Sequence, residues 1–444
     1  MRRLLFIVLC TIFTLGSCKG PAQGPDPSPS QDVSPDPSSE EPSSEDPAPA
    51  LLSGSFIQHW YVSSWTSTAW DTEMKVLSDA GIEYLIYSPL CSDGSEPAYS
   101  TLEACLKSAA RFGVKVFVGP NSNSGWWDSS KSAAWLNDQM TRGVAIATEA
   151  YNRFHDKYPS SFYGWYWDWE VDNVSWTSRA KMLAKAWNIT LDGLSGIDPS
   201  MPLLFSPFMN SAYGSAASYR DFWKDLFADL HLRKGDIFCP QDCVGAGGVP
   251  LTNSRGWFYQ LAEAAKTVDG LQFWANVETF EQFNLSGGAH FATASLKRIL
   301  QQMEAVKPFV SRIICFAYSH YLSPAQVREA YHDAYLEYLK TGSLPAVGTT
   351  GRVNSAMRSS SGSGVTLTWT MATKTDVDGF AIYKNGSLLV KCQIRGTSGS
   401  SGFSGSAGYS VPSTFTDPSG RASDTYEIAS YNILGDESPK VAFK

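Results

Sequence analysis

The feature that most constrains the fold of this chain is a regular alternation of short apolar segments with segments of helical periodicity. Eight apolar segments have the length and composition of β-strands. They are residues 55–61, 82–89, 114–120, 163–170, 202–208, 236–242, 271–280 and 313–319. Helical periodicity occupies 70–80, 101–112, 136–158, 178–194, 218–230, 257–268, 292–306 and 322–341. Strands that alternate with helices in this way indicate βα units and a parallel sheet.

The number of units then selects the architecture. Each apolar segment is continuous rather than alternating, as burial on both faces of a strand requires. Eight βα units over about 285 residues fit a (β/α)8 barrel, for which about 250 residues is typical. We therefore predict an α/β fold with a TIM barrel over residues 54–342. A doubly wound open sheet is the structural alternative.

The pattern changes beyond Pro345, where short strands replace the βα units. The predicted strands are 364–371, 379–384, 387–390, 413–417 and 425–431, and Asn385-Gly386 is typical of a tight hairpin turn. The runs Val365–Trp369, Gly379–Tyr383 and Tyr426–Asn432 resemble a fibronectin type III domain. This resemblance implies a small all-β sandwich over residues 346–444, and its Gly/Ser-rich segment 396–408 is expected to be a loop.

The N-terminus has the form of a bacterial export signal. Met1-Arg2-Arg3 precedes an apolar run, which ends in Leu15-Gly16-Ser17-Cys18. This ending resembles a lipobox, which implies cleavage before Cys18 and attachment of lipid to its thiol. Lys19 follows the cysteine, so we expect delivery to the outer membrane, facing the periplasm or the cell surface. The alternative is an ordinary signal peptide with an incidental cysteine.

Residues 19–53 are predicted to be a disordered linker, because this Pro/Ser/acidic tract cannot bury a core. The tract holds seven acids and one lysine, and this charge of −6 accounts for most of the net charge of −8. The folded part is therefore only weakly acidic, and we predict no nucleic-acid partner. Cys239 and Cys243 lack the two further ligands of a zinc site, and no phosphate-binding or nucleophile motif occurs, so no metal or cofactor is expected. The sequence leaves the oligomeric state open.

Acidic residues stand at the ends of two predicted barrel strands, where the active site of such a barrel lies. The fourth strand ends at Glu170 and the seventh at Glu278. A buried carboxylate costs several kcal/mol unless it is paired or hydrated, so these positions require a reason. Other side chains at the predicted strand ends form the candidate substrate contacts. They are Gln58, His59, Asp168, Asp172, Gln241, Asp242, Trp274, Asn276 and Tyr318.

Two facing carboxyl groups are what the cleavage of a glycosidic bond needs, one as acid and one as nucleophile or base. The arrangement resembles the large clan of retaining glycoside hydrolases on (β/α)8 barrels. Carried over from that clan, Glu170 would be the acid/base and Glu278 the nucleophile. The clan places Asn before the first of these acids, whereas this chain has Trp169. Tyr163–Tyr166 and Trp274–Phe280 resemble more closely an uncharacterised glycoside-hydrolase-like barrel family of Bacteroidetes lipoproteins, over residues 54–342.

Aromatic residues in the loops after strands one, three and four are candidates for stacking on sugar rings. These are Trp60, Trp65, Trp126, Trp127 and Trp176, whereas Trp165, Trp167 and Trp169 are predicted to pack against helices. The resulting hypothesis is a lipid-anchored hydrolase of O-glycosidic bonds in an oligo- or polysaccharide. One alternative is a carbohydrate-binding lipoprotein without turnover. A third is a lyase or amidase that uses Asp242 and a histidine.

Overall fold

The computed structural model describes residues 49–361, 364–371, 376–396 and 409–444. The predicted signal peptide, Cys18, nearly all of the linker and most of the Gly/Ser-rich loop lie outside these residues. None of the helices in the described ranges has the length and apolar character that a membrane crossing needs.

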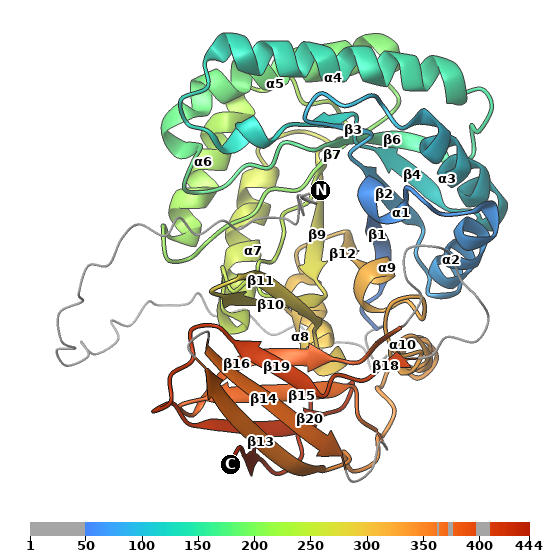
Figure 1. Ribbon diagram of the computed structural model, residues 1–444. Helices are drawn as coiled ribbons and strands as arrows, with labels where there is room; N and C mark the ends of the chain where they lie inside the picture. Colours follow the sequence, from blue (N-terminus) through green and yellow to red (C-terminus); the bar gives the residue numbers. More distant parts are fainter. Residues whose placement is uncertain (1–48, 362–363, 372–375, 397–408) are drawn as a thin grey trace, which may run out of the picture. The chain divides into compact units, whose positions relative to one another are not determined.

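Eight parallel strands form a closed barrel, which confirms the predicted fold class (Figure 1). In chain order they are β1 (Leu52–Gln58), β2 (Tyr84–Ser88), β4 (Lys115–Val118), β6 (Phe162–Trp167), β7 (Leu203–Phe205), β8 (Ile237–Phe238), β9 (Gln272–Glu278) and β12 (Arg312–Phe316). The barrel closes where β1 pairs with both β2 and β12. All eight predicted strands are present, and the open sheet is excluded.

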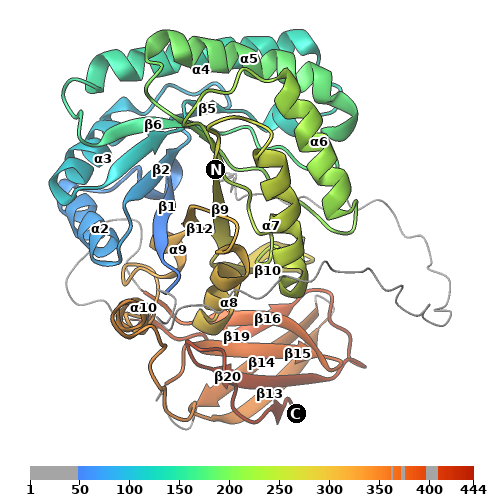
Figure 2. The same ribbon diagram turned by 180° about the vertical axis from the view of Figure 1, so that it is seen from behind.

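Helices connect successive strands and cover the outside of the barrel (Figures 1 and 2). They are α2 (Ser67–Asp79), α3 (Tyr99–Phe112), α4 (Ala133–Phe154), α5 (Ala180–Ile197), α6 (Ala216–Asp229), α7 (Leu251–Ala265), α8 (Leu296–Val306) and α10 (Ala330–Thr341). Several begin at a serine or threonine whose side chain accepts a backbone N–H, as Ser132 does from Trp135 and Ser295 from Arg298. The indole of Trp167 stacks on that of Trp187 in α5 at a centroid distance of 3.6 Å, so this strand residue packs outward as predicted.

Short elements at the carboxyl ends of the strands complete the barrel. They are α1 (His59–Val62), β3 (Cys91–Ser92), β5 (Asn121–Ser122), the 3-10 helices η1 (Ser124–Trp127) and η2 (Thr177–Arg179), and α9 (Tyr318–Tyr321). A hairpin of β10 (Phe280–Leu285) and β11 (Gly288–Thr293) follows β9. The prediction missed this hairpin and extended the α8 helix back over its end. It also began α10 too early, at residue 322.

The C-terminal region consists of antiparallel sheets around its own apolar core, which includes Trp369, Phe380 and Ile428. One sheet holds β13 (Val353–Ser361), β14 (Gly364–Met371) and β19 (Thr414–Asp417). The other holds β15 (Gly379–Lys384), β16 (Ser387–Gln393), β20 (Tyr426–Tyr431) and β21 (Val441–Ala442). The prediction missed β13 because serines dominate its sequence. The likeness to fibronectin type III and the domain bounds stay predictions.

The C-terminal region contacts α8 of the barrel. The backbone N–H of Leu296 donates to the carbonyl of Ile433 at 2.9 Å, and Lys297 pairs with Asp436 at 2.6 Å. A Cβ on Gly435 would lie 2.8 Å from the Cβ of Ser295, so the two backbones approach closely there. The first turn of α8 is therefore held by residues far downstream in the chain.

The six cysteines in the described residues are all buried. They are Cys91, Cys105, Cys239, Cys243, Cys315 and Cys392. Buried thiols of this kind behave as small apolar side chains. The packing interpretation predicted for Cys239, Cys243 and Cys315 is confirmed.

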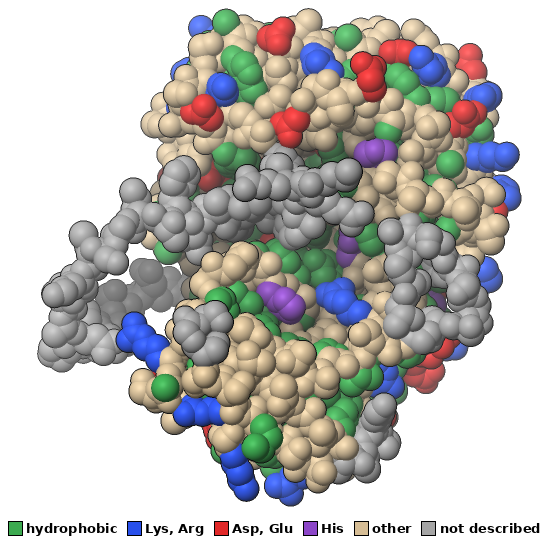
Figure 3. Space-filling view, in the orientation of Figure 1, with side chains coloured by type: hydrophobic (Ala, Val, Ile, Leu, Met, Phe, Trp, Pro, Cys, Tyr) green, Lys and Arg blue, Asp and Glu red, His purple; other side chains and the backbone are tan. Residues whose placement is uncertain are grey.

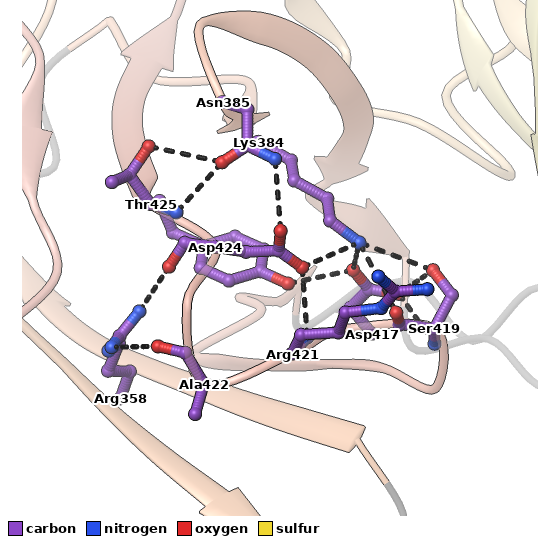
Figure 4. Close-up of polar contacts among 10 residues, drawn as sticks. Arg358, Lys384, Asn385, Asp417, Ser419, Arg421, Ala422, Asp424 and Thr425 are labelled. Carbon is purple, nitrogen blue, oxygen red and sulfur yellow. Dashed lines mark hydrogen bonds and ion pairs between the residues drawn. The ribbon is translucent and has the colours of Figure 1, made fainter.

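A polar network at one end of the C-terminal region gives a stability prediction (Figure 4). Lys384 contacts Asp417 at 2.8 Å and Asp424 at 3.2 Å, and Asp417 is buried. Lys384→Met leaves the Asp417 carboxylate without its cation, so we expect the free energy of unfolding to fall by about 1–3 kcal/mol at pH 7. Urea denaturation of the full chain measures this, with Lys340→Met, on an exposed lysine, as the control.

The pH dependence supplies a second readout of the same substitution. Burial raises the pKa of Asp417, but hydrogen bonds from Lys384, Ser419 and Tyr426 outweigh burial, so its pKa lies below the usual 3.8. A carboxyl group whose pKa is lower in the folded protein than in the unfolded chain stabilises the fold at pH values above its unfolded pKa. This contribution is lost as the pH falls through the folded pKa. The difference between Lys384→Met and wild type should therefore shrink below about pH 4. An unchanged difference there would contradict the ionic origin.

Candidate active site

The end of β6 carries two acids, and the first of them is fitted against the neighbouring strand. Asp168 is half-buried and accepts a hydrogen bond from the Ser88 hydroxyl at the end of β2. A Cβ on Gly119, just after β4, would lie 2.4 Å from Asp168 Oδ1, so only glycine leaves room for this carboxyl group. Burial raises the pKa of Asp168 well above its usual value. Asp168 therefore lies in the polar layer at the carboxyl end of the barrel.

Glu170 follows two residues later and is held by neighbours on both sides. Its Oε1 accepts a hydrogen bond from Gln241 Nε2 at 2.8 Å, and its backbone carbonyl accepts one from the Trp126 indole at 2.6 Å. The Glu170 side chain is partly exposed. Burial raises its pKa to about 7, opposed by the Gln241 bond and assisted by the charge of Asp172. A carboxyl group with this pKa can carry a proton at neutral pH and give it up.

Glu278 ends β9 and is fixed by backbone and side-chain contacts. Its Oε2 accepts the N–H of Ala246 at 2.7 Å. Its backbone N–H donates to Asp242 Oδ1 at 3.1 Å, and Gln302 Nε2 of α8 donates to both the Glu278 carbonyl, at 3.0 Å, and Asp242 Oδ2, at 2.5 Å. Only 1% of Glu278 is exposed. The carboxyl group is therefore positioned by the loop after β8 and by α8.

Asp242 and Glu278 titrate as a pair, and their environments push the two pKa values apart. Burial raises the pKa of Glu278, and the nearby charge of Asp242 raises it further. Asp242 is also buried, but bonds from Gln302 and two backbone N–H groups favour its charged form. We assign the shared negative charge first to Asp242, because it has more donors. Asp242 is thus a positioning residue beneath Glu278.

Polar side chains just after β7 and β8 and within β9 connect the surroundings of Glu170 with those of Glu278. Gln241 Nε2 also donates to the Ser206 carbonyl at 3.0 Å, and Asn276 Nδ2 donates to the Ser206 hydroxyl at 3.1 Å. Gln241 and Asn276 are bridged as neighbours in the sheet. Asn276 Oδ1 is buried and has no hydrogen-bond partner among the described residues. One hydrogen-bonded layer therefore extends from Glu170 through Gln241 to the residues below Glu278.

The structure places three predicted contacts away from this layer. Trp274 lies inside the barrel, 5.1 Å from the Tyr84 ring, because four residues of strand put it about 13 Å below Glu278. The Tyr318 hydroxyl is fully buried against His332 of α10 at 2.7 Å. Asp172 accepts the N–H groups of Val174 and Ser175 and shapes its own loop. Their assignment as substrate contacts gains no support from these positions.

The end of β1 contributes Gln58 and His59 to the rim. Both are half-buried, and His59 Nδ1 lies 2.8 Å from the Tyr87 hydroxyl. Burial lowers the pKa of His59, so its ring is neutral at pH 7. Gln58 is the last residue of β1, and its role as a substrate contact stays a prediction.

The tryptophans of the loops divide into two groups. Trp126 and Trp176 are buried, with ring centroids 4.0 Å apart, so they form part of the core and not a sugar platform. Trp65 and Trp127 are half-buried, whereas Trp60, after β1, is 41% exposed. Tyr213, after β7, is 58% exposed and was not predicted. Aromatic faces near the strand ends are thus fewer than the sequence indicated.

Residues that sequence reasoning missed are mostly neutral. Ser206 and Gln302 have no charge to mark them in an apolar strand or a helix. The segment Gly245-Ala246-Gly247-Gly248 could have been found, since such a run of small residues allows a close backbone approach. Within the described residues, no group of three or more His, Cys, Asp or Glu side chains could hold a metal ion.

Gly245 gives a direct test of how Glu278 is held. A Cβ there would lie 2.3 Å from the Phe280 carbonyl oxygen and 3.0 Å from Glu278 Oε2. Gly245→Ala should displace the loop and remove the Ala246 N–H from the carboxyl group, so we expect any hydrolytic kcat to fall roughly 10–100-fold. Gly256→Ala in α7, where no atom lies within 4 Å, is the control and should leave kcat unchanged. Equal rates in both variants would contradict the positioning role.

The fold defines this protein as a (β/α)8 barrel, with acidic residues at the ends of its fourth and seventh strands, Glu170 and Glu278. The chain belongs to the family described as Domain of unknown function (DUF4434), whose model matches residues 52–328. A search of curated proteins found no significant match.

Solved structures share the barrel fold at low sequence identity. A candidate α-L-fucosidase from Bacteroides thetaiotaomicron is 18% identical with a TM-score of 0.55, and the match covers 70% of this chain and 99% of that one. A β-glucuronidase from Bacteroides uniformis is 12% identical with a TM-score of 0.41, and the match covers 89% of this chain and 46% of that one. The likeness to the first of these structures shows the barrel fold alone.

Proposed function

We propose that this protein hydrolyses an O-glycosidic bond in an oligo- or polysaccharide, with Glu170 and Glu278 as its two carboxyl groups. The observation that carries the proposal is the hydrogen-bonded layer that holds both groups at one end of the barrel. Glu170 is bound by Gln241, and Glu278 is bound by Ala246 above Asp242. Asn276, whose Oδ1 has no hydrogen-bond partner in the described part of the chain, lies in the same layer.

The proposed reaction has two steps of a retaining mechanism. In the first, Glu278 as carboxylate attacks the anomeric carbon while Glu170 donates its proton to the departing oxygen. In the second, Glu170 takes a proton from water, which attacks the same carbon and releases Glu278. NMR of the first-formed anomer distinguishes retention from inversion.

The pKa directions predict an activity optimum near neutral pH. Activity requires Glu170 protonated and Glu278 ionised. Their pKa values are about 7 and about 8, so this combination is a minor state that is most populated between those two values. The rate should fall on the alkaline side as Glu170 loses its proton. On the acid side it should fall well above pH 4.5, because burial and Asp242 raise the pKa of Glu278 above that usual value. A kcat/KM profile from pH 4 to 10 measures both limbs, and an optimum below pH 5 would contradict these environments.

We also propose a location at the outer membrane. The Leu15-Gly16-Ser17-Cys18 motif and the following Lys19 support a lipid anchor there. The acidic linker that follows would separate the barrel from the membrane surface. Radiolabelled palmitate incorporation, compared between wild type and Cys18→Ala, tests the anchor.

A carbohydrate-binding protein without turnover is the second candidate function. The near-complete burial of Glu278, with 1% exposed, favours it, because an attacking carboxylate must reach the anomeric carbon. Product analysis on a panel of oligosaccharides, with binding measured in parallel, separates the two. Hydrolysis products absent from Glu278→Gln support the enzyme. Binding without products, unchanged in that variant, would overturn it.

A further inference from the structure

The C-terminal region extends one arginine to the end of the barrel. Arg395 lies in β17 (Arg395–Gly396), next to the loop that follows α9. It forms a β-bridge with Val327, and Gly396 N–H donates to the Gln326 carbonyl at 3.1 Å. Its guanidinium donates to the Phe291 carbonyl of β11 at 2.9 Å. Arg395 is thus fixed between the loop after β12 and the hairpin after β9.

Buried contacts on either side keep this position rigid. Tyr331 of α10 donates to Asp378 at 2.5 Å, and the Thr293 N–H donates to the Gln393 side chain at 2.9 Å. Strands β10 and β11 pack against β16, and Phe283 and Leu285 of the hairpin join the core of the C-terminal region. The guanidinium is therefore held at its site before any ligand binds.

Aromatic rings from α1, α9 and β12 lie at the end of the barrel where Arg395 bridges to the loop after α9. The rings of Tyr61 and His320 are 4.1 Å apart, and those of His320 and Phe316 are nearly parallel at 6.2 Å. The His320 Nε2 atom is buried without a hydrogen-bond partner among the described residues. Figure 3 shows apolar, histidine and Lys or Arg side chains around a hollow in the middle of the view. This group of rings, with its unsatisfied nitrogen, can offer a sugar an apolar surface and one hydrogen bond.

The charge of Arg395 acts on this group and extends toward Glu278. Burial lowers the pKa of His320 to about 3, and the Arg395 charge contributes. Burial raises the pKa of Tyr321 to about 12, while Arg395 lowers it and Glu278 raises it. The Phe280 ring, two residues beyond Glu278, lies 5.6 Å from the Tyr321 ring and 5.5 Å from the ring of Phe291, whose carbonyl accepts the Arg395 bond. Arg395 therefore lies beside the hairpin that follows Glu278.

Arg395 also lacks an acidic partner among the described residues, unlike neighbouring cations. Lys391 pairs with Glu281 at 2.8 Å, and Arg298 lies 4.0 Å from the same carboxylate. No described acid lies within 4.0 Å of Arg395. Its guanidinium donates to a backbone carbonyl and acts on the buried Asp378 only from beyond 4.0 Å, so no carboxylate among the described residues occupies its N–H groups. A guanidinium in this state can form a bidentate pair with a carboxylate or a sulfate.

We propose that Arg395 selects an acidic glycan, so that the C-terminal region supplies the residue that determines the substrate class of the barrel site. The acidic group, a carboxylate or a sulfate ester on the sugar, pairs with Arg395 while the sugar ring lies against Tyr61 and His320. The inference rests on the proposed carbohydrate site but does not require that the site hydrolyses its ligand.

The test uses pairs of oligosaccharides that differ only in charge. Oligogalacturonides are compared with their methyl esters, and sulfated galactan oligosaccharides with their desulfated forms, by calorimetry on residues 19–444. We expect at least one acidic member to bind at least tenfold more tightly than its neutral form. Arg395→Gln, which keeps an N–H donor for Phe291, should remove this preference and leave the affinity for the neutral oligosaccharides within twofold. Arg395→Lys should keep part of the preference. Arg352→Gln, an exposed arginine elsewhere in the C-terminal region, is the control.

The outcomes distinguish this inference from the proposed function. Preferential binding of neutral glycans, an acidic preference that survives Arg395→Gln, or binding of no acidic glycan would each overturn it. Hydrolysis of neutral glycans alone would support the proposed hydrolase function and overturn the inferred specificity for acidic glycans. Arg395-dependent binding of acidic glycans without products would sustain the specificity and count against the hydrolase. Equal thermal midpoints of wild type and Arg395→Gln establish that the variant is folded.

Discussion

Glu278→Gln should abolish turnover of every glycoside that the protein cleaves, whatever the leaving group. The substitution keeps the shape of the side chain, and its amide oxygen can still accept the Ala246 N–H. An amide cannot attack the anomeric carbon as a carboxylate does, so the first step loses its nucleophile. Because both steps pass through the same covalent bond to Glu278, a good leaving group cannot compensate. The measurement is kcat with an aryl glycoside and with a natural disaccharide.

Stability provides the control for this substitution, with a defined sign. The folded pKa of Glu278 is raised above the usual 4.5 by burial and by Asp242. The stability that its protonated form provides is therefore complete below pH 4.5 and is lost as the pH rises through the folded pKa. Glutamine cannot ionise, so the thermal midpoint of Glu278→Gln relative to wild type should increase from pH 5 to pH 9. Residual activity close to that of wild type would remove Glu278 from the mechanism.

Glu170→Gln should lower kcat by about 10²–10⁴-fold for substrates with a poor leaving group, the range typical of a lost general acid. The amide can neither protonate the departing oxygen nor activate water. A leaving group that is stable as an anion, such as dinitrophenolate, needs no proton, so the first step should be nearly normal for a dinitrophenyl glycoside. Such a substrate should then show a burst of one equivalent of product followed by slow release.

The burst distinguishes an acid from a residue that only shapes the site. Asp168 lies nearby and is bound by Ser88, so Asp168→Asn serves as a matched change of charge. It should affect all leaving groups equally, because its carboxyl group is fitted against Gly119 and has no assigned proton transfer. If Glu170→Gln shows that same uniform loss, the acid assignment is wrong.

The barrel could be predicted from the sequence because its strands obey one physical requirement. A strand buried on both faces must be continuously apolar, and β2 (Tyr84–Ser88) and β12 (Arg312–Phe316) show this directly. The β10–β11 hairpin could not be predicted in the same way. Its residues are only partly buried within the barrel, and part of their packing surface is β16, about 100 positions downstream.

The acids of the site were visible because charge is rare at the end of an apolar strand, as at Glu170 and Glu278. The position of a side chain along the barrel axis was harder to predict from the sequence. Period-two alternation puts Trp274 on the face of Glu278 but cannot show that it lies several layers lower. The supporting residues Ser206 and Gln302 were hidden because each is an ordinary polar residue until the fold brings it to an acid.

The contacts between the C-terminal region and α8 affect whether the barrel can be separated from the rest of the chain. Gln302, which holds Asp242 and Glu278, lies on the helix whose first turn is anchored by Ile433 and Asp436. A fragment cut at Gly342 would contain every candidate acid, yet it would free the helix that aligns two of them. We therefore expect the barrel to lose the alignment of Asp242 and Glu278 when it is separated from the C-terminal region. A substitution near residue 433 should displace Gln302 and, through it, both acids.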